Sequence, residues 1–298
     1  MYKCRAPKNK AELAKYYQLR WQALRKPWQQ PLGSEKDELE SQSYHRVIVD
    51  DTDNVVGVGR LHKTSQFHAQ IRYMAISDEL HGQGLGKLLI DELELLAAQV
   101  GVKTIELNAR EKAIGFYQKS NYINVGYSHT LYNAVNHVKM IKNIAVPKQH
   151  LTKIADNLQQ LWHETIPLSK AMNMNVAFFD QEKLLTTCEP SFNKNLHNTM
   201  FAGSIYTMAT LTGWAWVYFV LQAQTQHADI VLAKGNIKYL APLEGVAHAQ
   251  TLLRLVEGNT EPLAEGKNAR FNIDVEVCCG DKVAAVFTGS YVAMAKRT

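Results

Sequence analysis

Residues 81–86, HGQGLG, decide the fold of the first half of this chain. The three glycines at alternate positions follow an apolar stretch at 71–76, IRYMAI, and precede a leucine-rich run at 87–101. The apolar stretch predicts a β-strand, and the leucine-rich run has the one-face spacing of an amphipathic helix. A glycine loop between a strand and a helix leaves backbone amides exposed at the helix N-terminus, where an anion can bind.

Two common phosphate-binding motifs do not fit this loop. A P-loop needs GxxxxGK followed by Ser or Thr, whereas Gly82 and Gly86 are one position too close and Leu88 occupies the hydroxyl position. The dinucleotide fingerprint GxGxxG also differs from the spacing of Gly82, Gly84 and Gly86, and the strand before the loop is not the first of the chain. Taken alone, the loop is also compatible with a glycine-rich turn that binds nothing.

Helical and strand patterns alternate on both sides of the loop. The stretches 44–51 and 55–62 predict two strands joined by a turn, DTDN, into a hairpin. Further strands are predicted at 68–76, 102–109 and 137–144, and helices at 9–24, 85–101 and 112–122. The first half is therefore predicted to be a mixed α/β domain.

This order of elements resembles the GNAT family of N-acetyltransferases, whose motif Q/R-x-x-G-x-G/A opens a helix. Gly84 and Gly86 match the motif, His81 stands in place of Gln or Arg, and the resemblance covers residues 1 to about 145. It implies that acetyl-CoA is a substrate, with the pyrophosphate of coenzyme A bound by backbone amides and the pantetheine arm paired with the end of the strand. The amides implied for the pyrophosphate are those of Gly82, Gln83, Gly84, Leu85, Gly86 and Lys87, and the strand residues implied for the arm are Met74, Ala75 and Ile76.

The resemblance also implies two side chains near the reaction. Tyr117 matches the position at which many GNAT enzymes have a tyrosine that protonates the leaving thiolate, and Asn108 matches a residue near the cofactor. A packed tyrosine with a satisfied hydroxyl is the alternative for Tyr117. No carboxylate or histidine is fixed as the base for an amine substrate, because the strand before the loop offers Arg72 rather than an acid. Residues 20–37 are candidates for the wall of the acceptor pocket.

The second half begins a different pattern. Residues 201–226 carry no charge and are long enough to raise the question of a membrane helix, but Ser, Thr and Gln interrupt them, which favours a helix enclosed by protein. Other stretches predict a helix at 151–166 and strands at 174–180, 183–190, 228–242, 246–256, 269–279 and 282–294. A Gly-Asp turn joins the last two strands as a hairpin. Several antiparallel strands wrapped around one apolar helix are predicted.

That pattern resembles the hotdog fold of acyl thioesterases, and residues 193–209, NKNLHNTMFAGSIYTMA, resemble their polar loop and small-residue helix start. The resemblance implies that the amide of Gly203 polarises a thioester carbonyl and that Asn195, His197, Asn198 and Thr199 orient water. His197 replaces the usual carboxylate base, because no Asp or Glu lies between Glu189 and Asp229. A helix-capping and turn-forming loop is the alternative.

Composition excludes several classes of function. Residues 1–147 carry 20 Lys and Arg against 15 Asp and Glu, and residues 148–298 carry 13 against 13, without a basic run, so nucleic acid is not expected as a partner. The N-terminus has no apolar core of a signal peptide, and four cysteines without CxxC spacing indicate neither disulfides nor zinc. The histidines form no HxH or HxxxH pair, so no metal site is expected. A cytoplasmic protein is predicted.

The two halves together resemble the YiiD-like family, with a GNAT domain at 1–147 and a hotdog thioesterase domain at 148–298. This implies an α/β (α+β) chain that is a bifunctional acetyl-CoA-dependent N-acetyltransferase and acyl-CoA or acyl carrier protein thioesterase of fatty acid metabolism, paired as a homodimer through the hotdog domain. One alternative is decarboxylation of malonyl carrier protein or malonyl-CoA to an acetyl thioester for fatty acid synthesis, which needs no amine-deprotonating base. The other is an acyl-CoA sensor without turnover.

Overall fold

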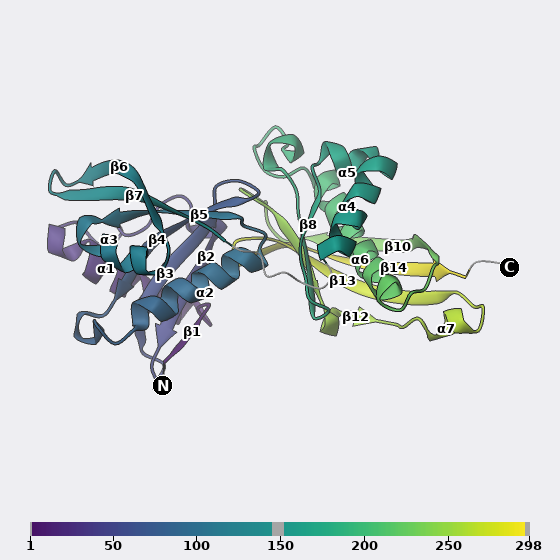
Figure 1. Cartoon of the computed structure of the whole chain (residues 1–298), viewed down its shortest axis with the longest axis horizontal. Coiled ribbons are helices and arrows are strands. Elements are labelled where there is room, and N and C mark those ends of the chain that lie inside the picture. The colour runs from purple at the N-terminus through teal and green to yellow at the C-terminus, as the bar shows by residue number, and fades with distance from the viewer. Residues whose placement is uncertain (1, 145–151, 296–298) are drawn as a thin grey trace. The chain divides into compact units, whose positions relative to one another are not determined.

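The computed structural model describes residues 2–144 and 152–295, which form an N-terminal and a C-terminal compact unit (Figure 1). Both units combine helices with a β-sheet, as the sequence patterns predict. The predicted domain boundary between residues 147 and 148 lies outside the described residues.

A seven-stranded sheet in the order β1-β2-β3-β4-β5-β7-β6 forms the centre of the first unit. Strands β4 and β5 run parallel, and all other neighbours are antiparallel. The strands are β1 (Lys3–Arg5), β2 (Ser43–Val49), β3 (Val55–Lys63), β4 (His68–Ile76), β5 (Thr104–Arg110), β6 (Ile123–Leu131) and β7 (Val135–Asn143). The helices are α1 (Lys10–Leu24), α2 (Leu85–Gln99) and α3 (Ile114–Lys119).

Helices α1 and α2 cover opposite faces of this sheet. Tyr16 of α1 packs in one buried cluster with Val58 of β3, whereas Leu89 and Leu93 of α2 lie against the next residue, Gly59. Successive residues of a strand point to opposite faces, so the two helices bury the two sides of β3. The buried residues of α2 recur at helical spacing, because Leu85, Leu89, Leu93 and Leu96 are buried together with their neighbours Ile90 and Ala97.

Two strands of the first unit are not predicted by the sequence patterns. β1 has only three residues, and most of the side chains of β6, INVGYSHTL, are exposed. β6 therefore lacks the apolar alternation that marks a half-buried strand. This omission affects the site, because the hairpin of β6 and β7 brings two histidines to it.

Strands β4 and β5 separate toward their C-terminal ends. Their pairing covers only His68–Ile71 of β4 and Thr104–Leu107 of β5, although both strands continue beyond it. On its other side β4 has a bulge, since Tyr73 and Met74 together face Gly59 of β3. Tyr73 has a φ of 58°, which non-glycine residues rarely adopt. A bulge bends the strand that carries it, and here it bends β4 where its pairing with β5 stops.

A buried ionic cluster lies beside the bulge. Arg60 of β3 donates to Asp37 over 2.5 and 2.9 Å and to Glu40 over 2.8 Å, and Arg20 of α1 donates to Glu40 over 2.6 Å. The hydroxyl of Tyr73 donates to Asp37 over 3.0 Å, and the guanidinium of Arg20 lies 3.4 Å from the centre of the Tyr73 ring. Both arginines are fully buried. Burial alone would raise the pKa of Asp37, but the hydrogen bonds and attraction of Arg60 hold it well below its usual range.

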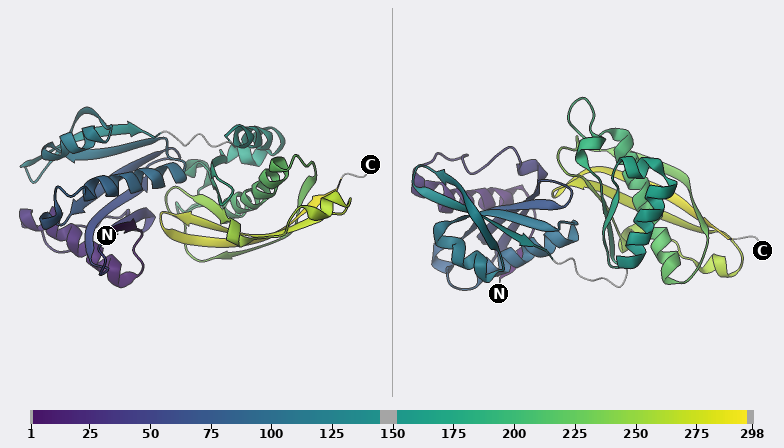
Figure 2. Two further views of the ribbon diagram at one scale, coloured as in Figure 1. Left: turned by 60° about the horizontal axis from the view of Figure 1, so that its bottom comes forward. Right: turned by 45° about the horizontal axis from the view of Figure 1, so that its top comes forward.

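The second unit wraps a six-stranded antiparallel path, β10-β14-β13-β11-β9-β8, around helix α6 (Figures 1 and 2), with β12 paired to β13. Its strands are β8 (Asn175–Phe179), β9 (Lys183–Thr187), β10 (Asp229–Tyr239), β11 (His248–Leu252), β12 (Val256–Glu257), β13 (Ala269–Cys279) and β14 (Lys282–Met294). Its helices are α4 (Thr152–Thr165), α5 (Pro167–Ala171), α6 (Ala202–Ala223) and α7 (Glu261–Ala264).

The uncharged stretch 201–226 supplies helix α6, the core of the second unit. Trp216 and Phe219 of α6 are buried in one cluster with Phe271 and Ile273 of β13. The sheet therefore buries the apolar surface of α6 within the protein. Among residues 2–144 and 152–295, none of the helices is long and apolar enough to cross a membrane.

The ionic cluster leads to a stability prediction. Asp37→Asn leaves the buried Arg60 with a weaker partner, so we expect the first unit to lose about 3 kcal/mol of unfolding free energy at pH 7. The pKa of Asp37 is lower in the folded protein than the value of about 3.9 in an unfolded chain. The contribution is therefore present above about pH 4 and is lost as the pH falls through the folded pKa. Hydrogen exchange of β3 peptides, corrected for intrinsic rates at each pH, measures it.

Glu38→Gln is the matched control, because Glu38 is exposed in the same segment and should change the stability by less than about 0.5 kcal/mol. The role given to the ionic cluster is wrong if both variants protect β3 equally, or if the deficit of Asp37→Asn grows as the pH is lowered.

Candidate functional site

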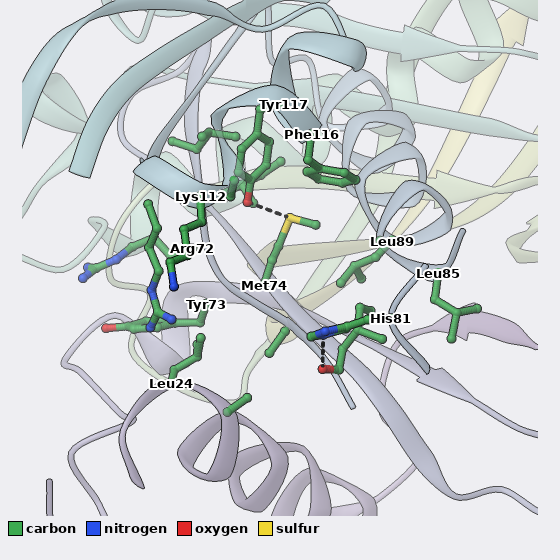
Figure 3. A pocket seen from close by; sticks show the side chains of 18 of the residues that line it. Leu24, Arg72, Tyr73, Met74, His81, Leu85, Leu89, Lys112, Phe116 and Tyr117 are labelled. Atoms are coloured by element: carbon green, nitrogen blue, oxygen red, sulfur yellow. Dashed lines mark hydrogen bonds between the residues drawn. The ribbon is translucent and has the colours of Figure 1, made fainter. Parts of the chain in front are cut away.

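A cavity of about 760 Å³ lies in the first unit where β4 and β5 separate (Figure 3). This volume is in the usual range for small-molecule sites. The strand β4, the glycine loop, the start of α2, β5, α3 and the β6–β7 hairpin all contribute to its wall. The residues that line it include Arg25, Arg72, Met74, Ala75, Ile76, Gly82, Gly84, Leu85, Gly86, Lys87, Asn108, Arg110, Lys112, Phe116, Tyr117, His129 and His137.

The three glycines of the loop have two different functions. Gly82 and Gly84 have φ values of +82° and +81°, and a Cβ at either position would meet nothing within 4 Å. Glycine is needed at these two positions for the backbone conformation rather than for space. Gly86 has an ordinary φ, but a Cβ there would come within 3.2 Å of the Phe116 ring of α3. The conformation of the loop and its packing against α3 are therefore encoded separately.

The loop presents unpaired amides to the cavity. The first hydrogen bond of α2 runs from the amide of Leu88 to the carbonyl of Gly84 over 3.1 Å. The amides of Leu85, Gly86 and Lys87 consequently have no acceptor in a preceding turn of the helix. They lie at the positive end of the helix dipole, where an anion is stabilised.

The edge of β4 supplies backbone groups next to this loop. Beyond Ile71, β4 has no register partner in β5, and Met74, Ala75 and Ile76 line the cavity there. The ring Nε2 of His81 donates to the carbonyl of Ile76 over 3.1 Å (Figure 3). His81 thus joins the loop to the end of the strand, and an extended ligand can pair with the remaining backbone of β4.

Tyr117 of α3 points into the cavity from the opposite wall. Its hydroxyl lies 3.7 Å from the sulfur of Met74 (Figure 3). Burial raises its pKa to about 12, although the positive charge of Arg110 opposes the rise. The phenol is therefore protonated at neutral pH and can donate a proton to a group on β4.

One end of the cavity is strongly cationic. Arg25, which follows α1, and Arg110, at the end of β5, both line it, together with Lys112. Arg72 also lines the cavity, but its guanidinium is held by Asp37 over 3.1 Å. Among the lining residues that the structure describes, the one carboxylate is that of Asp78, next to the glycine loop. The cationic end is therefore suited to an anionic group.

Two histidines of the β6–β7 hairpin lie at the same end. The rings of His129 and His137 are stacked with centroids 4.6 Å apart and planes 7° from parallel. Nδ1 of His137 lies 3.0 Å from the carbonyl of Val135, which can only accept, so this nitrogen carries the proton. Burial lowers the pKa of His137, and the charges of His129 and Arg110 lower it further. At neutral pH its Nε2 is available as a proton acceptor.

The cavity gathers most residues that the sequence singles out in the first unit. All the predicted coenzyme A residues line it except Gln83, and so does Tyr117. Sequence patterns did not identify Arg110, His129 or His137 as parts of the site. The signal for the two histidines is the hairpin register, because His129 pairs with His137 across β6 and β7.

In the second unit the predicted polar loop is closed by Asn195. Its Nδ2 donates to Oγ1 of Thr199 over 2.9 Å, and its Oδ1 accepts from the amides of His197 and Thr199 over 2.8 and 3.3 Å. The carboxamide is therefore engaged within the loop, as in the turn-forming alternative. His197 itself is exposed at the loop, so its ring is open to solvent.

The N-terminus of α6 is open beside this loop. Its N-cap residue, Phe201, makes no side-chain cap, and the first intrahelical bond runs from the amide of Ile205 to the carbonyl of Phe201 over 3.0 Å. The amide of Gly203 thus has no acceptor in an earlier turn. A Cβ at Gly203 would collide with the Phe201 ring, so this position needs glycine for the ring to pack as it does.

A second cavity, of about 380 Å³, lies elsewhere in the second unit. Residues of α6 near its C-terminus, including Trp214 and Tyr218, line it with His227 and Asp229. None of Asn195, Thr199 and Gly203 contributes to its wall. The predicted loop and this cavity are therefore different sites.

Two family models match the chain without overlapping. "Acetyltransferase (GNAT) family" matches residues 13–122, and "Putative thioesterase (yiiD_Cterm)" matches residues 155–295. Among curated proteins, the chain is similar to "Uncharacterized N-acetyltransferase YjcF" of Bacillus subtilis (strain 168), with 28% identity over 136 residues that cover 46% of this chain and 96% of the relative.

Two solved structures are similar to parts of the chain. A "putative thioesterase" from Shewanella oneidensis is 38% identical, with 48% of this chain and 98% of that chain covered and a TM-score of 0.46. An aminoglycoside 6'-N-acetyltransferase in complex with coenzyme A is 18% identical, with 50% and 99% covered and a TM-score of 0.41.

The two family matches follow the order of the two units and confirm the predicted fold classes. They lie on either side of the segment 145–151, which is outside the described residues. The chain therefore carries a domain of the acetyltransferase (GNAT) family, followed by a domain of the YiiD_C family, which is described as a putative thioesterase.

Proposed function

We propose that the first unit transfers an acetyl group from acetyl-CoA to an amine and that the second unit hydrolyses acyl thioesters. The observation that carries the first part is the cavity between β4 and β5, with open amides of the glycine loop on one side and the Tyr117 hydroxyl on the other. The glycine loop would bind the anionic pyrophosphate of coenzyme A, the edge of β4 its extended pantetheine arm, and Tyr117 would lie near the thioester.

Coenzyme A would be held mainly by backbone. Its pyrophosphate binds the amides of the segment 82–87 at the positive end of α2. Its pantetheine arm pairs with the open edge of β4 at Met74–Ile76, which directs the thioester toward Tyr117. The amine nitrogen attacks the carbonyl carbon, the C–N bond forms and the C–S bond breaks. Tyr117 donates its proton to the sulfur and regains one from the attacking nitrogen.

The second unit would use the N-terminus of α6. The thioester oxygen accepts a hydrogen bond from the amide of Gly203. This hydrogen bond becomes stronger when negative charge develops on that oxygen. His197 takes a proton from a water that attacks the carbonyl carbon. The C–O bond forms, the C–S bond breaks, and His197 passes this proton to the leaving sulfur. An acyl group on coenzyme A or on a carrier protein fits this step equally, because both present a pantetheine arm.

A homodimer through the second unit is part of this proposal. Three apolar side chains near the predicted loop are strongly exposed: Phe192 at 74%, Leu196 at 87% and Phe201 at 54%. Exposed apolar groups that gather beside a site indicate a contact surface. A second copy would cover them and exclude water from the thioester, and sedimentation of the full chain measures whether the pair forms.

The glycine loop gives the first activity prediction. Gly84→Val should weaken coenzyme A binding about tenfold or more, because a β-branched residue resists the φ of +81° and turns the amides away. Gly84→Asn should keep most of the affinity, since asparagine tolerates the left-handed conformation. Calorimetric titration of the full chain with coenzyme A measures both. The backbone site is refuted if the folded valine variant binds as tightly as the wild type.

The polar loop gives the second activity prediction. His197→Gln should lower acyl-CoA hydrolysis about 100-fold without changing the melting temperature, because the ring is exposed and acts only as a base. Thiol release without added amine, in the Gly84→Val background, isolates this activity from the first unit. Lys194→Gln, an exposed neighbour, is the control. Full hydrolysis by His197→Gln would remove His197 from the mechanism.

Carbon dioxide and bound ligand are measured in the same reactions. Malonyl-CoA that yields carbon dioxide without thiol would favour decarboxylation over both proposed reactions. Binding of acyl-CoA with neither product would favour a sensor.

A further inference from the structure

We propose that the amine accepted by the first unit carries a carboxylate close to its nitrogen, that Arg110 and Arg25 bind this carboxylate, and that His137 is the general base. The inference rests on the proposed acetyl transfer and names the acceptor class for the same cavity. It goes beyond the transfer itself, which requires only some amine.

The three side chains that define this end lie in a row. Arg110 of β5 is the register partner of His137 of β7, and His137 is the register partner of His129 of β6. Directly opposite residues of an antiparallel pair have Cβ atoms about 4.5–5.5 Å apart and share a face of the sheet. All three line the cavity, so a guanidinium and an imidazole can contact one small ligand together.

The positive charge of this end has no protein counterion among the residues that the structure describes. Arg25 donates to the carbonyls of Ser34 and Leu24, which fixes it without neutralising it. No ion pair forms to Arg25, Arg110 or Lys112 in the described part of the chain, in contrast to Arg72 with Asp37. Burial and the charge of Arg25 both lower the pKa of Arg110. A ligand carboxylate would relieve this repulsion and can accept two bonds from one guanidinium.

The base follows from the tautomer of His137. Nδ1 donates to Val135, so the lone pair of Nε2 faces away from that bond and is free to take a proton. An ammonium bound beside two guanidiniums loses its proton more readily, because like charges disfavour its charged form. His137 Nε2 takes this proton, and the freed lone pair of the amine forms the C–N bond as the C–S bond breaks. The second nitrogen proton passes to Tyr117 after Tyr117 has protonated the sulfur, and one proton in total leaves through His137.

A dicarboxylic acyl thioester is the other source of a carboxylate. Its decarboxylation would convert the bound anion into neutral carbon dioxide, so two unpaired guanidiniums would stabilise the starting state more than the transition state. Decarboxylation also needs no proton acceptor at His137. Both considerations favour the carboxylate of an amine acceptor.

The test compares matched acids and amides on the full chain. Acetyl-CoA is incubated with the common L-amino acids and with the corresponding amino acid amides, and N-acetyl products are quantified by mass spectrometry. We expect kcat/KM to be at least about tenfold higher for the acids, and Arg110→Met to bring the ratio near one while coenzyme A binding stays unchanged. Lys119→Met, which removes an exposed charge of α3 outside the cavity, should keep the ratio.

A second measurement does not depend on turnover. N-Acetylglycine should bind the coenzyme A-loaded wild type at least about tenfold more tightly than N-acetylglycinamide, and Arg110→Met should lose this difference. His137→Gln should keep the binding difference but acetylate much more slowly. The residual acetylation rate should no longer show the ionisation of His137 in its pH dependence. The groups facing His137 in that titration are Arg110 of β5, His129 of β6 and Arg25 after α1.

Several results overturn the inference. Equal binding of N-acetylglycine and its amide refutes the carboxylate site even if no amine is acetylated. Faster acetylation of amides refutes the acceptor class while leaving acetyl transfer itself intact. Arg110-dependent release of carbon dioxide from malonyl-CoA, without discrimination between the two N-acetyl compounds, assigns the cationic end to the acyl group instead. Failure of coenzyme A to bind refutes the proposed transfer and not the carboxylate site.

Discussion

The ion pairs of Arg60 and Arg20 with Asp37 and Glu40 hold the first unit in the shape that its cavity requires. Asp37 also accepts from the hydroxyl of Tyr73, whose backbone has the unusual φ of 58° at the bulge of β4. A strained residue persists only where its surroundings fix it, and here the ring is held by a guanidinium above it and a carboxylate at its end. The bulge thus accounts for the separation of β4 from β5 after Ile71.

The same arrangement separates two kinds of charge. Asp37 and Glu40 form ion pairs with the buried arginines Arg60 and Arg20. Arg72, which lines the cavity, is paired with Asp37 as well. In the described part of the chain, Arg25 and Arg110 have no such carboxylate partner, and both line the cavity. Near this end of the cavity, the carboxylates of Asp37 and Glu40 are thus engaged in structural ion pairs, whereas Arg25 and Arg110 would be available to a bound anion.

The sequence predicted the parts of the first site that depend on local backbone. Glycine spacing at 82–86 and the helical leucine pattern after it define a strand, a loop and a helix N-terminus without any knowledge of packing. It did not predict the cationic and histidine end, because that end depends on which strands become neighbours. β6 has mostly exposed side chains and no clear period, so the pairing of His129 with His137 and of His137 with Arg110 is visible only in the sheet.

In the second unit, the proposed site relies on backbone dipoles rather than on charged side chains. Between Glu189 and Asp229 it has no acidic residue, and the helix that starts at Ala202 is uncharged throughout its length. Its proposed oxyanion site consists of backbone amides, whose partial charges need no counterion and tolerate the apolar surroundings that a thioester chain requires. A lysine or arginine there would either have to be paired or face water. The N-terminus of α6, beside the loop that Asn195 closes, would thus stabilise an oxyanion at the accessible end of a helix whose later turns are buried with Trp216 and Phe219.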